Sequence, residues 1–189
     1  ILRTDPVDFQ KIRVRGRLSP LASLRFDGSF SLFDHDDDLE SIDFSSRDRD
    51  LMFQFTYTPH NRITVSGSYE RSSYHSNLLF LIPQTFQTDR SIYRERGDYA
   101  DLFLSLGLIR NARLDLGYSV WGTVGDFPLT SHRPLARLEV PVGERVTAYA
   151  QWNYYDYNEK VKLFPQDYQT HLVSVGLRLS LNKLSAPTP

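Results

Sequence analysis

The chain has 189 residues, of which 40% are hydrophobic and 13% aromatic, and its formal net charge is −1. This composition excludes a disordered chain, and a charge so close to zero gives no indication of nucleic-acid binding. The sequence contains no cysteine, which excludes disulfides, thiolate metal sites, cysteine nucleophiles and covalently attached haem on this chain. No apolar run approaches the roughly 20 residues that a membrane helix requires.

Nine segments alternate between apolar and polar residues, the pattern of β-strands with two different faces. In the clearest of them, Val146, Ala148 and Trp152 share one face, whereas Arg145 and Gln151 share the other. No segment has a sustained helical period, and all ten prolines fall in turns, loops, strand ends or tails. The predicted strands span residues 9–18, 22–33, 50–58, 62–74, 98–109, 112–121, 134–141, 145–157 and 168–181.

Tight polar turns alternate with longer charged segments along the chain. The turns are predicted at Ser19-Pro20, His60-Asn61, Arg110-Asn111 and Gly143-Glu144. Short turns at one end and long loops at the other are typical of an outer-membrane β-barrel, in which the short turns face the periplasm. The fold class predicted is therefore all-β, an antiparallel up-and-down transmembrane barrel.

The predicted strand count is odd, whereas single-chain bacterial barrels have even numbers of strands. With the first turn in the periplasm, the first strand would begin on the outer side, which predicts at least one strand upstream. We therefore expect the C-terminal part of a larger barrel, with strands and loops over residues 1–181 and a tail over residues 182–189. The alternative is a miscount at 9–18 or 134–141.

Aromatic residues gather near the predicted strand ends, where a membrane meets water. Tyr and Trp prefer this interface because an apolar ring there meets a wet polar tip. The predicted aromatic girdle consists of Tyr69, Tyr118, Trp121, Trp152 and Tyr154. The alternative is a β-sandwich core that uses the same rings for packing.

The other face of the predicted strands is charged. An arginine facing lipid at mid-membrane would cost about 2–4 kcal/mol, so this face is expected to line a lumen. The predicted lumen-lining residues are Lys11, Arg13, Arg15, Arg17, Arg25, Asp27, Arg113, Asp115, Arg137 and Glu139. They would form either a water-filled pore that favours anions or a network of ion pairs that plugs the barrel, since only the wider barrels leave a channel.

Two segments invite other functions. Asp34-His35-Asp36-Asp37-Asp38 is rich in oxygen ligands, but it lacks the glycine and the bidentate glutamate of a calcium loop, so we expect a solvated surface loop. The apolar run 78–82 would extend a strand, fold into the lumen or contact a partner. No zinc-binding histidine pair and no Gly-x-Ser-x-Gly motif is present, so no metal site and no enzyme is predicted.

The last predicted strand, Ser174-Val175-Gly176-Leu177-Arg178-Leu179-Ser180-Leu181, resembles the C-terminal targeting signal of outer-membrane proteins. Ser174, Gly176, Leu179 and Leu181 occupy its polar, glycine and hydrophobic positions, although leucines replace the usual aromatics. The resemblance implies recognition by the barrel assembly machinery. The hairpin from Thr58 to Tyr69 is similar to hairpins in the porin partner of outer-membrane multihaem cytochrome conduits.

These features lead to an expectation of porin-like passage of small hydrophilic solutes through a charged lumen in the bacterial outer membrane. Two alternatives stay open: a barrel that sheathes or anchors a partner such as a multihaem cytochrome or another envelope protein, and a soluble β-sandwich binding module. The expected partners are outer-membrane lipid and the barrel assembly machinery. No cofactor is expected on this chain.

Overall fold

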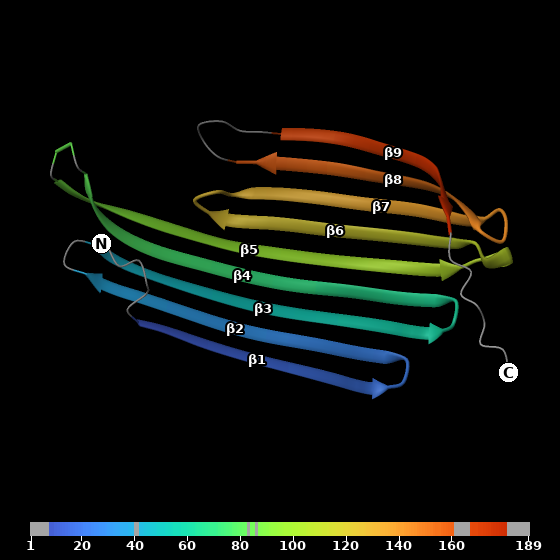
Figure 1. The fold of residues 1–189 in the computed structure, drawn as a ribbon, viewed down its shortest axis with the longest axis horizontal. Helices are drawn as coiled ribbons and strands as arrows, with labels where there is room; N and C mark the ends of the chain where they lie inside the picture. Colours follow the sequence, from blue (N-terminus) through green and yellow to red (C-terminus); the bar gives the residue numbers. More distant parts are fainter. Residues whose placement is uncertain (1–7, 40–41, 83, 86, 161–166, 181–189) are drawn as a thin grey trace.

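A computed structural model describes residues 8–39, 42–82, 84–85, 87–160 and 167–180. Nine strands form one antiparallel sheet in which each is hydrogen-bonded to its neighbours in the sequence (Figure 1). Their bounds are β1 Asp8–Leu21, β2 Leu24–Leu39, β3 Ile42–His60, β4 Ile63–Ile82, β5 Gln87–Gly107, β6 Arg113–Gly125, β7 Leu129–Pro141, β8 Val146–Glu159 and β9 Asp167–Leu179. A single-turn 3-10 helix, η1 (Ile109–Asn111), connects β5 and β6. The all-β class and the nine predicted strands are confirmed.

The sheet is curved but open. Strands β1 and β9 lie at opposite edges and are not paired with each other (Figure 1). The predicted up-and-down order is therefore confirmed, whereas the nine described strands do not close into a barrel. Within the described part of the chain, no helix is long and apolar enough to cross a membrane.

Strand register divides the sheet into two faces of opposite character. Residues opposite each other in an antiparallel pair point to the same side, and successive residues alternate between sides. One row on what we call the charged face runs across Arg17, Asp27, Gln54, Ser68, Asp101, Ser119 and Arg133. The adjacent row on the opposite face, here the apolar face, runs across Leu18, Phe26, Phe55, Gly67, Leu102, Tyr118 and Pro134.

The apolar face carries a continuous apolar band at the end of the sheet nearest the short turns. Its limits are Leu24–Leu32 in β2, Leu51–Tyr57 in β3, Ile63–Tyr69 in β4, Ala100–Leu106 in β5, Leu114–Val120 in β6, Val146–Tyr154 in β8 and Val173–Leu179 in β9. Among the described residues no hydrophobic side chain is buried, and Leu102 and Val175 are 52% and 76% exposed. Without a cover on the apolar band, this sheet has no hydrophobic core.

The strands are longer than predicted, because most of the residues assigned to long loops belong to strands. Strands β2 and β3 pair as far as Leu39 and Ile42, and β4 and β5 pair as far as Ile82 and Gln87. The charged segments after residues 33 and 74 are therefore mostly strand, and the contrast between short turns and long loops largely disappears. The two ends of the sheet still differ, because the strands extend further beyond the apolar band at the end away from the predicted turns than at the other end (Figure 1).

The connections at the other end fall close to the predicted turns. The first lies at Ala22-Ser23 rather than Ser19-Pro20, because β1 continues through Pro20 with a register shift between Leu18 and Leu21. A proline cannot donate a ladder hydrogen bond, so it is tolerated at such an irregularity. The other three turns follow β3, β5 and β7 at the predicted places, and all four lie at one end of the sheet (Figure 1).

The turn between β5 and β6 contains strained backbone at Arg110, which has φ 58° and ψ 33°, next to Asn111 with φ 59°. Left-handed backbone costs about 1–2 kcal/mol for most residues but less for asparagine. Arg110→Asn is therefore expected to raise the free energy of unfolding by about 1 kcal/mol, measured by urea titration of the folded protein. Arg145→Asn removes an arginine from a turn without such backbone, and an equal gain there would contradict the explanation.

Candidate functional site

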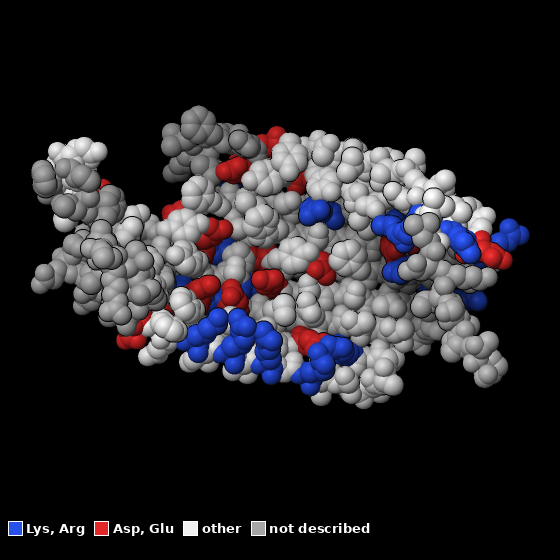
Figure 2. Space-filling view, viewed as in Figure 1, with Lys and Arg blue, Asp and Glu red and all other residues white. Residues whose placement is uncertain are grey.

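Every residue predicted to line a lumen lies on the charged face. Lys11, Arg13, Arg15 and Arg17 follow one another along β1, and Arg17 is opposite Asp27. Arg113 is opposite Glu139, and Asp115 is opposite Arg137, on the same side of the sheet. Figure 2 shows this face, with basic side chains in a row over β1 and acidic side chains over the strands beside it. The lumen itself stays a prediction, because the nine strands enclose none.

Three cations of β1 have no acidic partner. Lys11, Arg13 and Arg15 are opposite Phe33, Ser31 and Ser29. No carboxylate of the described residues lies within ion-pair distance of these three side chains. Their charges are therefore available to ions and solutes in the solvent.

The remaining charges form ion pairs within the sheet. The Arg17 and Arg25 Nε atoms each lie 2.6 Å from an oxygen of Asp27. The Arg113 Nε atom lies 2.8 Å from Asp115, and the Arg137 and Arg178 guanidinium nitrogens lie 2.5 and 3.2 Å from Glu139. Half-exposed pairs of this kind contribute little stability each. Five arginines share three carboxylates in these pairs, so the turn end of the charged face keeps an excess of two positive charges, whereas Lys11, Arg13 and Arg15 add three along β1.

Acidic side chains occupy the middle strands of the charged face. Asp48, Asp50 and Glu70 lie there, two or three strands away from β1. Burial raises the pKa of Asp48, and the neighbouring Asp50 carboxylate raises it further. Asp101 accepts hydrogen bonds from the backbone nitrogen and hydroxyl of Ser68, at 3.0 and 2.5 Å. A basic edge strand and an acidic centre thus divide this face into two regions of opposite charge.

Aromatic rings lie flat across glycines on the charged face. A Cβ atom added at Gly117 would meet the ring of Phe103, and one added at Gly176 would lie 2.7 Å from the Tyr149 hydroxyl. The glycines therefore leave room for rings that would otherwise stand away from the sheet. This also gives a local packing reason for the glycine of the segment that resembles a targeting signal. Ser174, Gly176 and Leu179 lie in β9, whereas Leu181 lies outside the described residues.

Four of the five predicted girdle residues lie on the apolar face, in the half of the apolar band away from the turns: Tyr69 and Tyr154 are at its limit, and Tyr118 and Trp152 lie two residues inside it. Tyr69 donates a hydrogen bond to Asp98 at 2.6 Å, Tyr118 is 2.7 Å from His132 Nδ1, and the Trp152 indole donates to His171 at 3.2 Å. The ring of Tyr154 lies 4.7 Å from that of His171. Each ring thus has an apolar side and a polar partner, as expected at an interface.

Trp121 is the exception, because it is opposite Tyr99 and Ser131 on the charged face. It therefore does not share a face with the other four residues, as one girdle requires. Trp121 is three residues from Tyr118 and two residues from Ser119. Residues an even number of positions apart share a face of a strand, so strict alternation would have placed Trp121 with Ser119 on the charged face.

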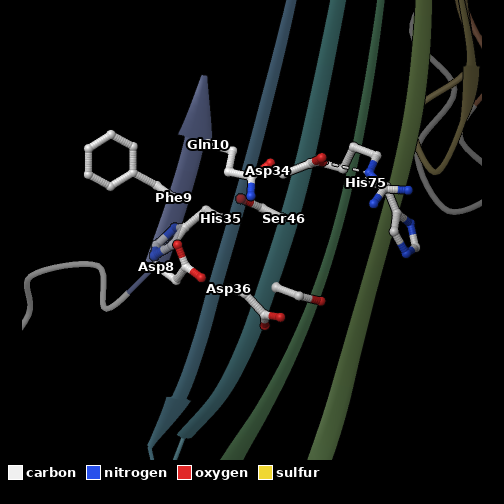
Figure 3. A pocket seen from close by; sticks show the side chains of 10 residues that line it. Asp8, Phe9, Gln10, Asp34, His35, Asp36, Ser46 and His75 are labelled. Carbon is white, nitrogen blue, oxygen red and sulfur yellow. Dashed lines mark hydrogen bonds and ion pairs between the residues drawn. The ribbon is translucent and has the colours of Figure 1, made fainter. Parts of the chain in front are cut away.

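The acidic segment predicted to be a surface loop is part of a strand. Asp34 and Asp36 point to the apolar face and His35 to the charged face, which separates them. The Asp34 carboxylate pairs with Arg47 at 2.6 Å, the contact drawn in Figure 3. In the described part of the chain, no group of three or more histidines and carboxylates could hold a metal ion. The apolar run 78–82 extends β4, the first of its three predicted alternatives.

One cluster was not predicted, because all its residues except Arg71 lie outside the predicted strands. Arg47 and Arg49 of β3, Arg71 of β4, and Arg94 and Arg96 of β5 lie on the apolar face just beyond the apolar band. Continuing the alternation outward from Leu51 and Ala100 would have found them. We call these five residues the outer arginine cluster.

No protein-family model matches the chain, and neither a curated protein nor a solved structure shows significant similarity to it. A proposal for the function of this protein therefore rests on its fold and on the distribution of its side chains.

Proposed function

We propose that this sheet is part of the wall of an outer-membrane β-barrel of porin type, with its apolar face against lipid and its charged face towards a water-filled lumen. One observation carries the proposal: a nine-stranded sheet buries no hydrophobic side chain among its described residues, yet a continuous apolar band covers one of its faces. Water covers the charged face at no cost, whereas the apolar band requires a hydrophobic cover.

The dimensions of the apolar band support a membrane as that cover. The band spans nine positions in β2 and β8 and seven in β3, β4, β5, β6 and β9. At about 3.3 Å per residue this is roughly 23–30 Å along the strands. Strands tilted by about 40° then span roughly 18–23 Å of height, compared with the ~25 Å apolar band of outer-membrane barrels.

The two free edges of the sheet support closure by further strands. Edge strands leave a row of unpaired backbone groups, and lipid offers these groups no hydrogen bonds. In the proposed barrel, β1 and β9 therefore each pair with a strand outside the nine described. The orientation follows from bacterial barrels, whose larger extramembrane parts, here the strand ends that project beyond the apolar band, are extracellular. The turn end of the sheet is then periplasmic, and the projecting ends of β2–β5 are extracellular.

The proposed mechanism is diffusion of small hydrophilic solutes through the lumen, with selectivity set by the charges on its wall. Lys11, Arg13 and Arg15 attract anions because no carboxylate of the described residues neutralises them. The flat packing of Phe103 and Tyr149 over glycines keeps these rings out of the lumen.

The test is conductance. The full-length protein, purified in detergent and added to planar lipid bilayers, is expected to give stepwise ion conductance. Bilayer insertion without conductance, together with haem absorbance from a copurified protein, would favour the sheathing barrel instead. Partition into the aqueous phase without detergent would overturn both barrel functions and favour a soluble module.

A further inference from the structure

The outer arginine cluster has a regular geometry on three adjacent strands. Register places Arg49, Ser73 and Arg96 in one row and Arg47, His75 and Arg94 in the next row. Neighbouring strands are about 4.8 Å apart, so the arginines of one row are about 10 Å apart, on either side of β4. The small side chain of Ser73 stands between Arg49 and Arg96.

The cluster has an excess of positive charge. Arg47 pairs with Asp34, and Arg71 pairs with Asp98 at 2.6 Å, while Arg96 is 3.8 Å from Asp98. The guanidinium groups of Arg49 and Arg94 have no partner among the described residues. The Asp126 carboxylate also lies here, because it accepts a hydrogen bond from the Arg94 backbone nitrogen at 2.7 Å. Five arginines against these three carboxylates leave an excess of two positive charges, and all five side chains are exposed.

The position of the cluster indicates what these charges meet. Arg49 lies two residues beyond Leu51, and Arg71 lies two residues beyond Tyr69, at the edge of the apolar band away from the turns. If the apolar band faces acyl chains, as in the proposed function on which this inference rests, the cluster lies at the depth of the lipid headgroups. Because that edge is the extracellular one, these headgroups belong to the outer leaflet.

We propose that the outer arginine cluster binds the phosphate groups of a phosphorylated lipid in the outer leaflet. Guanidinium groups donate paired hydrogen bonds that match the geometry of phosphate oxygens. The adjoining apolar band accommodates the acyl chains of the same molecule, so lipid is a better occupant than a soluble anion. A lipid bound at the cluster would contact the apolar band with its acyl chains and the arginines with its phosphate groups.

The experiment compares two triple variants of the full-length protein in phosphatidylcholine vesicles that contain labelled diphosphorylated lipid A. One variant is Arg49→Gln, Arg94→Gln and Arg96→Gln; the matched control is Lys11→Gln, Arg13→Gln and Arg15→Gln on the charged face. An arginine near an anionic headgroup contributes about fivefold in affinity before screening by salt. The first variant is therefore expected to bind lipid A about tenfold to 100-fold more weakly, and the control to bind it normally, as read by energy transfer from tryptophan.

Several outcomes would overturn the proposal. One is equal binding of lipid A by both variants. A second is binding of dephosphorylated lipid A by the original protein as strongly as the diphosphorylated form. A third is displacement of lipid A by inorganic pyrophosphate at equal phosphate concentration, which would indicate a site for free phosphate. The proposed function has a separate readout, because flotation shows whether the protein inserts into pure phosphatidylcholine vesicles. Insertion without selective lipid binding refutes only this inference, whereas a failure to insert refutes both.

Discussion

Leu102→Arg is expected to lower the free energy of unfolding in a lipid bilayer by about 2–4 kcal/mol, the cost of an arginine at mid-membrane on the lipid face of a barrel. Leu102 lies within the apolar band of β5, between Gly67 and Tyr118 in its row, and is 52% exposed. Equilibrium urea titration of the full-length protein in phospholipid vesicles measures the change.

Two further variants make this result specific to a membrane. Gln54→Arg places the same side chain on the charged face, one row away and opposite Asp27, where we expect a change below about 1 kcal/mol. Ile12→Arg changes the apolar face of β1 near the headgroup edge, where the cost falls to about 0–1 kcal/mol. Equal losses at Leu102 and Ile12 would mean that depth in a membrane does not determine the cost.

Replacing Lys11, Arg13 and Arg15 together by glutamine is expected to reduce the preference of the proposed pore for anions. A unit charge about 10 Å from a permeating ion contributes about 0.4 kcal/mol in water before screening. The Debye length is about 10 Å at 0.1 M salt and about 30 Å at 0.01 M. Because the three charges attract anions and repel cations, their removal is expected to lower the ratio of chloride to potassium permeability. The decrease is about fivefold at 0.1 M salt and about 20-fold at 0.01 M. Reversal potentials across planar bilayers measure this ratio.

The control for selectivity is the triple glutamine variant at Arg49, Arg94 and Arg96. It removes the same number of charges from the other side of the wall, so the permeability ratio is expected to stay within about twofold of the original. Arg17 is left in place in the first variant because its loss would leave Asp27 without one of its two cations. An equal shift in both triple variants would show that Lys11, Arg13 and Arg15 do not line the pore.

The number of strands and their two faces were predictable because alternation is a local property of the sequence. Alternating runs such as Val146–Tyr154 require only that one face meets apolar surroundings and the other meets water. The strand ends were less predictable: beyond Phe33, and between Tyr69 and Leu78, both faces are mostly polar, so the apolar contrast that marks a strand disappears. Pairing with a neighbouring strand continues there without that contrast, and the outer arginine cluster lies in this region.

The curvature and closure of the sheet could not be predicted from any one segment. Closure depends on strand number, tilt and stagger together, which are properties of the complete set of strands. The flat packing of Phe103 over Gly117 shows a second limit. Phe103 and Gly117 are fourteen residues apart in the sequence, and only the register of β5 and β6 brings them together.

Because every strand pairs only with its neighbours in the sequence, the sheet is modular in units of one hairpin. Removing or duplicating a hairpin such as β3–β4 leaves the entering and leaving chains at the same end of the sheet and preserves the assignment of faces in every other strand. The proposed barrel would therefore widen or narrow by two strands at a time in evolution without redesign of any remaining segment.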